Sequence, residues 1–158
     1  MERYLEEHTE NSAVQKLITL PYPVFEKVEN IPWTPWVMDG VEYKLLSVDK
    51  RSGGFTCMLR VAPNTVAPVH KHLGAIELYV ISGDIYYDAD DIGRAGDYMY
   101  EAAGDIHSPK SDTGCVLFIV FHGPIAGLNS DGSIAAIVDG EFMLDMAKKD
   151  NVAARVYL

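Results

Sequence analysis

The residues of this sequence whose type and spacing are best suited to chemistry are three histidines. His70 and His72 stand two apart in PVHKHLGAIELYVISG, so on a strand both imidazoles project from one face. Such a pair lets two ring nitrogens converge on a cation at roughly 2.0–2.2 Å. His107 comes later, in GDYMYEAAGDIHSP, and a hairpin between the two segments would bring it beside the pair. The sequence therefore predicts a metal site that contains three histidines.

Glu77 is the predicted fourth ligand. It follows His72 on a strand in which Glu77, Tyr79 and Ile81 share one face. A carboxylate on an otherwise apolar strand is costly unless an ion compensates its charge, and a metal would do so. Tyr79 would then lie on the ligand face as a catalytic candidate, where its hydroxyl could orient a substrate. A core tyrosine bonded to the backbone is the alternative.

The segment FTCMLRV supplies candidate substrate-binding residues. Both faces of this strand are largely apolar, so either face could form the wall of a small-molecule pocket. Met58 and Arg60 share one face, and Arg60 could bind an anionic substrate oxygen or pair with a buried carboxylate. A surface arginine is the alternative. His122 ends the run VLFIVF, where it could line the mouth of a barrel or have a structural role.

Short strands are the elements that must position these residues. From residue 41 onward, short apolar runs alternate with turn residues, as in VEYKLLSV and GFTCMLRVA on either side of DKRSGG. This pattern predicts an all-β fold, a sandwich or small barrel, over residues 41–140. The segment EFMLDMAKKDN has apolar residues at helical spacing and predicts a short C-terminal helix over residues 141–150.

The remaining N-terminal part, residues 1–40, is expected to form a short helix and then an extended arm. The arm is rich in proline, which favours extended backbone, and Trp33 and Trp36 are expected to anchor it by burial. No linker or change of composition divides the 158 residues, so we expect one domain over residues 1–158.

Composition and charge exclude several classes of partner. A formal net charge of −10 repels phosphate backbones, so no nucleic-acid partner is expected. No apolar run approaches the roughly 20 residues that cross a bilayer, and the polar N-terminus lacks the apolar stretch of a secretory signal. Cys57 and Cys115 lie in apolar runs and are expected to be buried free thiols. These features predict a cytoplasmic protein with no membrane partner.

Two segments of the chain resemble the paired motifs of the cupin superfamily. The first motif is matched by His70-Lys71-His72, Glu77 and Gly83. The second runs from Gly96 to His107, with Ala102 in place of the usual proline, which should loosen a turn without removing a ligand. Ser111 stands where an asparagine often follows, which puts one hydrogen bond in question. The resemblance implies a double-stranded β-helix, or jelly-roll barrel, that holds one divalent transition metal: Fe(II), Zn, Ni, Mn or Co.

A narrower resemblance covers the segments around these motifs. WTPWVMDGVEYKLLSVDKRSGGFTCMLRVAPN and LNSDGSIAAIVDGEFMLDMA are similar to small cupins that cleave acetylacetone or dihydroxyacetophenone. This likeness implies a dioxygenase that cleaves a C–C bond of a small β-diketone or hydroxyaryl ketone with O₂, with Fe(II) favoured as the metal.

Glu101 matches a glutamate of these dioxygenase-like cupins. The resemblance implies a catalytic role for it, or a contact with the second ring nitrogen of a histidine ligand. A solvated carboxylate at a strand edge is the alternative. Some cupins of this kind bind metal through histidines alone, so Glu77 could lie near the metal without touching it.

Two other functions stay open at this point. The layout is also similar to the cupin part of zinc-binding anti-sigma factors, which are non-catalytic sensors. Those carry an N-terminal zinc region with cysteine and histidine ligands, whereas the N-terminal stretch here has only His8. Isomerase or sugar chemistry needs a polar, basic pocket, for which only Arg60 and His122 are candidates. Small barrels with an aromatic arm often pair through edges or exchanged arms, so a homodimer or homotetramer is expected.

Overall fold

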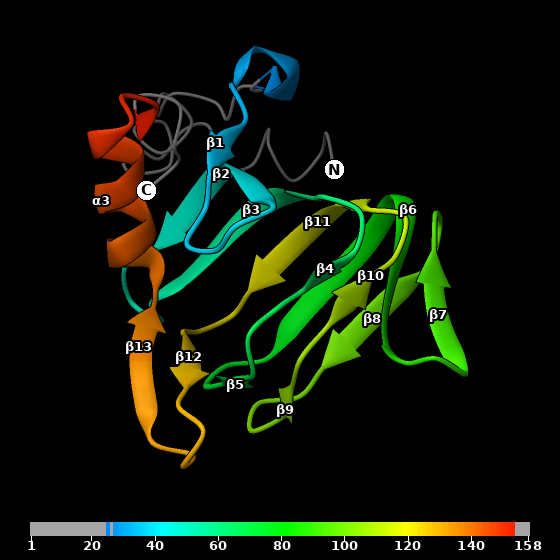
Figure 1. Cartoon of the computed structure of the whole chain (residues 1–158). Coiled ribbons are helices and arrows are strands. Elements are labelled where there is room, and N and C mark those ends of the chain that lie inside the picture. The colour runs from blue at the N-terminus through cyan, green and yellow to red at the C-terminus, as the bar shows by residue number, and fades with distance from the viewer. Residues whose placement is uncertain (1–24, 26, 154–158) are drawn as a thin grey trace, which may run out of the picture.

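The short strands predicted from the sequence form a curled, mostly β structure that ends in one α-helix (Figure 1). The structure is a computed structural model that describes Phe25 and residues 27–153, so the predicted N-terminal helix lies outside the described residues. None of the helices described there is long and apolar enough to cross a membrane. The elements are η1 (Val28–Asn30), β1 (Thr34–Pro35), β2 (Val41–Asp49), β3 (Gly54–Val61), β4 (Thr65–Val66), β5 (His70–His72), β6 (Ile76–Asp88), β7 (Asp91–Arg94), β8 (Tyr98–Glu101), β9 (Ile106–His107), β10 (Lys110–Ser111), β11 (Cys115–Phe121), β12 (Ile125–Leu128), β13 (Ile134–Val138) and α3 (Gly140–Lys149).

Two sheets form the body of the molecule. The larger has nine strands in the order β1-β2-β3-β11-β6-β10-β4, with β7 and β8 also paired to β6. The smaller has four strands in the order β13-β12-β5-β9. Together they curl into a half-barrel, with the hairpin-linked strands β2 and β3 next to α3 (Figure 1). The all-β prediction, the β2–β3 hairpin and the C-terminal helix are confirmed.

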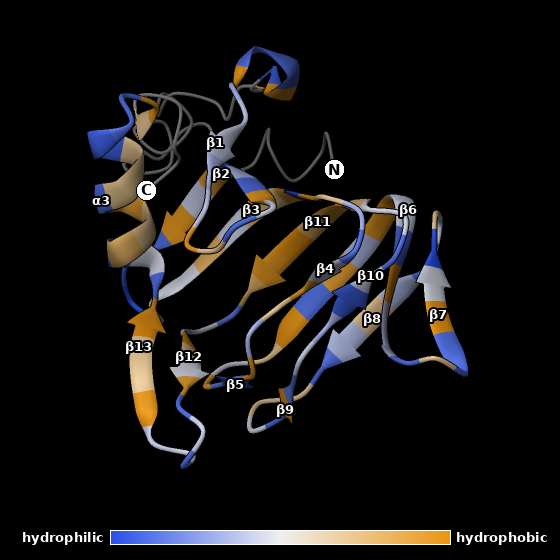
Figure 2. Cartoon of the chain, viewed as in Figure 1, coloured by the Kyte–Doolittle hydropathy of each residue, from blue (hydrophilic) through white to orange (hydrophobic). Residues whose placement is uncertain are grey.

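Strand alternation decides which side chains fill the interior. Leu117 of β11 lies opposite Leu59 of β3, and Ile119 lies opposite Cys57, and all four are buried. Figure 2 shows β11 as a largely hydrophobic ribbon within the curled sheet. Because antiparallel neighbours turn the same face inward, the apolar residues of several strands meet in one core.

The long strand β6 changes face part-way along its length. Val116 of β11 pairs with Ser82, but the next residue, Leu117, pairs with Val80, so Ile81 is an extra residue. One extra residue moves every later side chain to the opposite face of the sheet. Val80 is therefore buried before the bulge, and Ile85 is buried after it.

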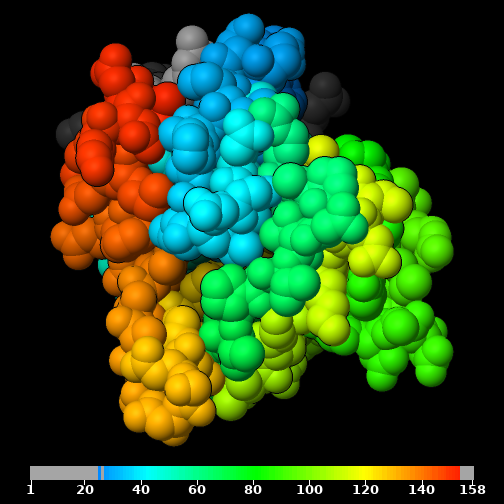
Figure 3. Space-filling view, in the orientation of Figure 1, coloured from blue at the N-terminus to red at the C-terminus, as the bar shows by residue number. Residues whose placement is uncertain are grey.

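The N-terminal arm is attached to the sheet and to α3. β1 continues the larger sheet by pairing with β2. The indole nitrogen of Trp36 donates to the sulfur of Met143 at 3.1 Å, which joins the arm to the helix. Two cations lie over the ring of Trp33, with Lys44 4.8 Å and Arg60 4.7 Å from the ring centroid. Figure 3 shows the arm packed directly beside the C-terminal helix.

Gly83 permits the close approach of β6 to the turn before β11, and we expect its replacement to be costly. Its φ is +81°, and an added Cβ would collide with the carbonyl oxygen of Gly114. Gly96 also has a positive φ, +98°, but an added Cβ there meets nothing within 4 Å. Gly83→Ala should lower the free energy of unfolding by about 3 kcal/mol or more, and Gly96→Ala by about 1 kcal/mol. Urea denaturation measures both, and equal losses would contradict a role for the close approach.

Candidate metal centre

The pairing of β5 with β9 brings the three predicted histidines together. His70 lies opposite His107, and His72 follows on the same face as His70. The Nε2 atoms of His72 and His107 are 2.9 Å apart, and one ring nitrogen of each histidine lies within 4.8 Å of the others. His70 Nδ1 can donate to the carbonyl oxygen of Pro68 at 2.9 Å, which leaves its Nε2 free.

Burial favours the uncharged form of these three imidazoles. Burial is the largest cause that lowers the pKa of His72 and of His107 to about 4, and neighbouring histidine rings lower both further. Burial also lowers the pKa of His70. Because metals bind the neutral imidazole, the rings need not lose a proton to accept an ion at neutral pH.

Glu101 places a buried carboxyl group beside the histidines. Its Oε2 is 3.3 Å from His72 Nδ1 and 3.8 Å from His107 Nε2. The hydroxyl of Tyr87 donates to Oε1 of Glu101. The Tyr87 ring also stacks on His107, with ring centroids 4.3 Å apart. Burial, followed by the nearby charge of Asp105, raises the pKa of Glu101 to about 7.

The contacts of His72 fit a divalent metal ion. Its Nδ1 is buried without a hydrogen bond to any described residue, although Glu101 Oε2 lies 3.3 Å away. An ion held through Nε2 would fix the proton on Nδ1, facing the carboxylate that can accept it. The 2.9 Å between the Nε2 atoms of His72 and His107 is also the spacing of two nitrogens bound at right angles at about 2.0–2.1 Å. Three imidazoles with a nearby carboxyl suit Fe(II), Mn, Co, Ni and Zn alike.

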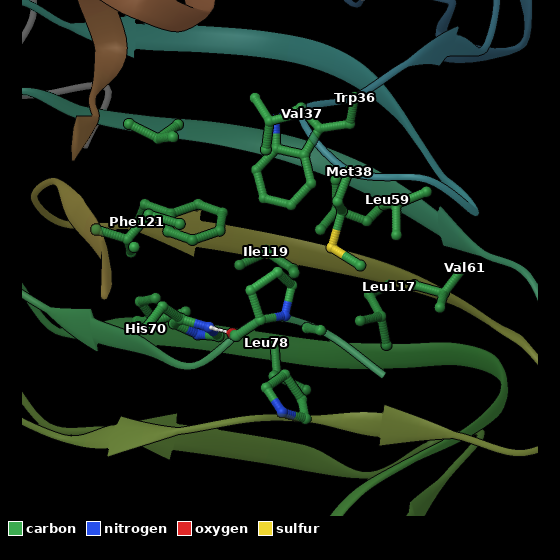
Figure 4. Close-up of a pocket in the computed structure, with 18 of the residues that line it drawn as sticks. Trp36, Val37, Met38, Leu59, Val61, His70, Leu78, Leu117, Ile119 and Phe121 are labelled. Atoms are coloured by element: carbon green, nitrogen blue, oxygen red, sulfur yellow. Dashed lines mark hydrogen bonds between the residues drawn. The ribbon is translucent and has the colours of Figure 1, made fainter. Parts of the chain in front are cut away.

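An apolar cavity of about 310 Å³ opens beside this cluster. Figure 4 shows His70 and Leu78 on one side and Trp36, Val37 and Met38 on the opposite side. Inward side chains of β3, β6 and β11 complete the wall: Leu59, Val61, Leu78, Leu117, Ile119 and Phe121. A cavity of this size can hold a small organic molecule next to the histidines.

The predicted position of Glu77 at the metal is corrected by the structure. Ile76 and Leu78 are buried, so alternation places Glu77 on the outer face of β6. There its carboxylate is 2.7 Å from His122 Nε2 and accepts a hydrogen bond from the Tyr98 hydroxyl at 2.9 Å. These two hydrogen bonds, that of His122 first, lower the pKa of Glu77. Surface partners and solvent, rather than a metal, compensate this carboxylate.

Met58 and Arg60 also lie outside the cavity, contrary to the substrate-binding prediction. Cys57 and Leu59 are the residues of β3 that turn inward, so Met58 and Arg60 face outward. Arg60 Nη2 forms an ion pair with Glu42 Oε2 at 2.6 Å. The alternative of a surface arginine therefore fits this residue.

Tyr79 and His122 are likewise on the outside of the barrel. Tyr79 shares the outer face of Glu77 and is 46% exposed. His122 is exposed and paired with Glu77, and neither Tyr79 nor His122 lines the cavity beside the histidines. Of the two residues predicted to be catalytic, the structure brings only Glu101 to the cluster.

Tyr87 is the site residue that the sequence prediction missed. Simple alternation from Glu77 places Tyr87 on the outer face, but the bulge at Ile81 reverses the pattern and turns Tyr87 inward. The available signal was the apolar Ile85, which shares the face of Tyr87 in DIYYD. Trp36 was predicted as an anchor only, and its place in the cavity wall was not foreseen.

Fold and site together define a cupin, with histidines suited to a metal on the inside of a curled β-barrel. A family model described as the ChrR cupin-like domain matches residues 23–126, and the chain belongs to this family. No match is found among curated protein sequences.

Solved structures with the same fold include proteins of different kinds. An RmlC-like cupin protein from Ralstonia eutropha has a TM-score of 0.76 at 21% identity, over 85% of this chain and 89% of that one. An acetylacetone dioxygenase from Acinetobacter johnsonii has a TM-score of 0.70 at 17% identity, over 80% and 91%. The anti-sigma factor ChrR in complex with SigE, from Rhodobacter sphaeroides, has a TM-score of 0.52 at 20% identity, over 72% and 66%. At these identities the likeness shows the fold alone.

Proposed function

We propose that this protein is a dioxygenase that cleaves a C–C bond of a small β-diketone or hydroxyaryl ketone with O₂ at a mononuclear Fe(II) site. The observation that carries the proposal is the place of the histidine cluster, at the polar end of an apolar cavity with Glu101 beside it. The fold shared with an acetylacetone dioxygenase supports it.

His70, His72 and His107 would hold the iron, and Glu101 would stay outside the ligand set. When bound, Fe(II) supplies Lewis-acid activation of an enolate and electron transfer to O₂. The chain's own part is to offer three neutral nitrogens from two short paired strands, so that their positions are fixed before the ion arrives.

Glu101 is the proposed general base for the acidic carbon between the two carbonyl groups of the substrate. Tyr87 donates to Oε1, so Oε2 remains directed at the cluster, where it can accept a substrate proton or hold the N–H of His72. The walls of the same space are mainly apolar, and such surroundings would strengthen these interactions.

Protein reconstituted with Fe(II) under anaerobic conditions is expected to consume O₂ and diketone in equal amounts, because a dioxygenase places both oxygen atoms in its products. An oxygen electrode and chromatography of the products, with acetylacetone and dihydroxyacetophenone as substrates, measure this. The same protein loaded with Zn(II) is the control and should consume no O₂. Iron-loaded protein without turnover across a panel of β-diketones and hydroxyaryl ketones would contradict the proposal.

The second candidate is a non-catalytic metal-binding sensor, and membership of the ChrR cupin-like family favours it. The cavity beside the histidines favours the enzyme, because a sensor needs no space for a substrate. Protein loaded with Co(II) separates the two. A visible spectrum that changes on addition of acetylacetone supports an open coordination position, and an unchanged spectrum supports the sensor.

A further inference from the structure

The cavity has a polar end and an apolar end. His70, His72, Glu101 and Tyr87 supply polar atoms at the metal end. Elsewhere on its described wall, the hydroxyls of Thr65 and Ser111 already donate to the Ala62 carbonyl oxygen and to Asp84. Lys110 is exposed. The remaining wall therefore offers a ligand mainly apolar contact.

Part of the apolar end comes from outside the barrel strands. Trp36, Val37 and Met38, from the arm between β1 and β2, face the histidine side across the cavity (Figure 4). The arm is held in place because the Trp36 backbone N–H donates to the Val41 carbonyl oxygen at 2.9 Å and its indole donates to Met143 at 3.1 Å.

The volume of the cavity exceeds what the smallest β-diketone fills. An apolar cavity of about 150 Å³ can hold a benzene molecule, and this cavity has about 310 Å³. Acetylacetone has about seven non-hydrogen atoms and would leave the end near Met38 unfilled. A phenyl substituent on the same diketone would reach that end and bury its ring against apolar side chains.

On the basis of the function proposed above, we propose that the substrate is a β-diketone with a ring-sized apolar substituent, and that Met38 is a specificity-determining residue that contacts this substituent. The diketone oxygens would lie at the histidines, and the substituent would lie between the arm and the β11 side chains Leu117 and Ile119. Specificity would then depend on a segment outside the barrel.

Binding to Zn(II)-loaded protein tests this without turnover. By isothermal titration calorimetry, benzoylacetone should bind about tenfold or more tightly than acetylacetone, because only its ring reaches the apolar end. Met38→Ala should weaken benzoylacetone binding about fivefold and acetylacetone binding less than about twofold. Met38→Trp should fill the space and exclude benzoylacetone while acetylacetone still binds.

Met58→Ala is the matched control, since Met58 lies on the outer face of β3, and it should change neither affinity. Equal affinities for the two diketones, or a ratio that neither Met38 variant changes, would overturn the inference. Selective binding without O₂ uptake by the iron-loaded protein would support the pocket assignment and remove the dioxygenase function. O₂ uptake by the iron-loaded protein with no preference between the two diketones would support the dioxygenase function and overturn the pocket assignment.

Discussion

Replacing His72 with alanine will abolish stoichiometric metal binding and lower Fe(II)-dependent O₂ uptake by more than about 100-fold. His72 is 1% exposed and lies between the other parts of the site, with Nε2 2.9 Å from His107 and Nδ1 3.3 Å from Glu101. Loss of the His72 imidazole removes one metal ligand. It also removes the contact between the metal ligands and the carboxyl group of Glu101. Metal content after reconstitution and desalting, measured by mass spectrometry, checks the first part.

His122→Ala is the matched control, because it removes an exposed histidine that the structure keeps outside the cavity. It should bind one ion per chain as the wild type does. His107→Gln is a second variant that leaves a smaller gap and should also lose the metal, in case His72→Ala does not fold. Circular dichroism shows whether each protein is folded. Full metal content in His72→Ala would contradict the three-histidine site.

Glu101→Gln should weaken metal binding by about 10- to 100-fold, the usual effect of losing a carboxylate that orients a histidine ligand. The amide has almost the same shape, so packing against Tyr87 is kept while the carboxylate that faces His72 Nδ1 is lost. O₂ uptake should fall further than metal affinity does, because an amide cannot accept the substrate proton. Competition with a chelator of known affinity measures the metal affinity of the variant. The rate of O₂ uptake at saturating Fe(II) measures its catalysis.

Glu77→Gln makes the same chemical change on the outer face of β6, where the carboxylate bonds to His122 and Tyr98. It should alter metal affinity by less than about twofold. A larger effect from Glu77→Gln than from Glu101→Gln would reverse the assignment of the two glutamates.

The juxtaposition of His70 and His72 is predictable because it depends only on short-range geometry. His70 and His72 are two apart on one strand, which places them on one face whatever the rest of the fold does. His107 is distant in sequence, and it reaches the pair because β9 pairs with β5. The fold class was likewise readable from the many short apolar runs between turn residues.

Glu77 lies away from the histidines, although its spacing from His72 matches the cupin motif, because strand alternation decides which face it occupies. Ile76, Leu78 and Val80 form the apolar half of the alternation, which by itself places Glu77 outside. The inward face of β3 could not be predicted from the sequence, because both faces of this strand are largely apolar. Its pairing with β11 places Leu59 inside. Tyr87 is harder to predict for a third reason, because the bulge in β6 reverses the alternation and only the apolar Ile85 signals that reversal in the sequence.

Anomalous diffraction from a crystal of the Fe(II)-loaded protein would locate the metal ion and identify its ligands. We expect one peak per chain within about 2.0–2.2 Å of a ring nitrogen of His70, His72 and His107, with Glu77 on the far side of the sheet. A peak at Glu77 and His122, or protein that holds no ion at the three histidines under saturating metal, would contradict this metal site.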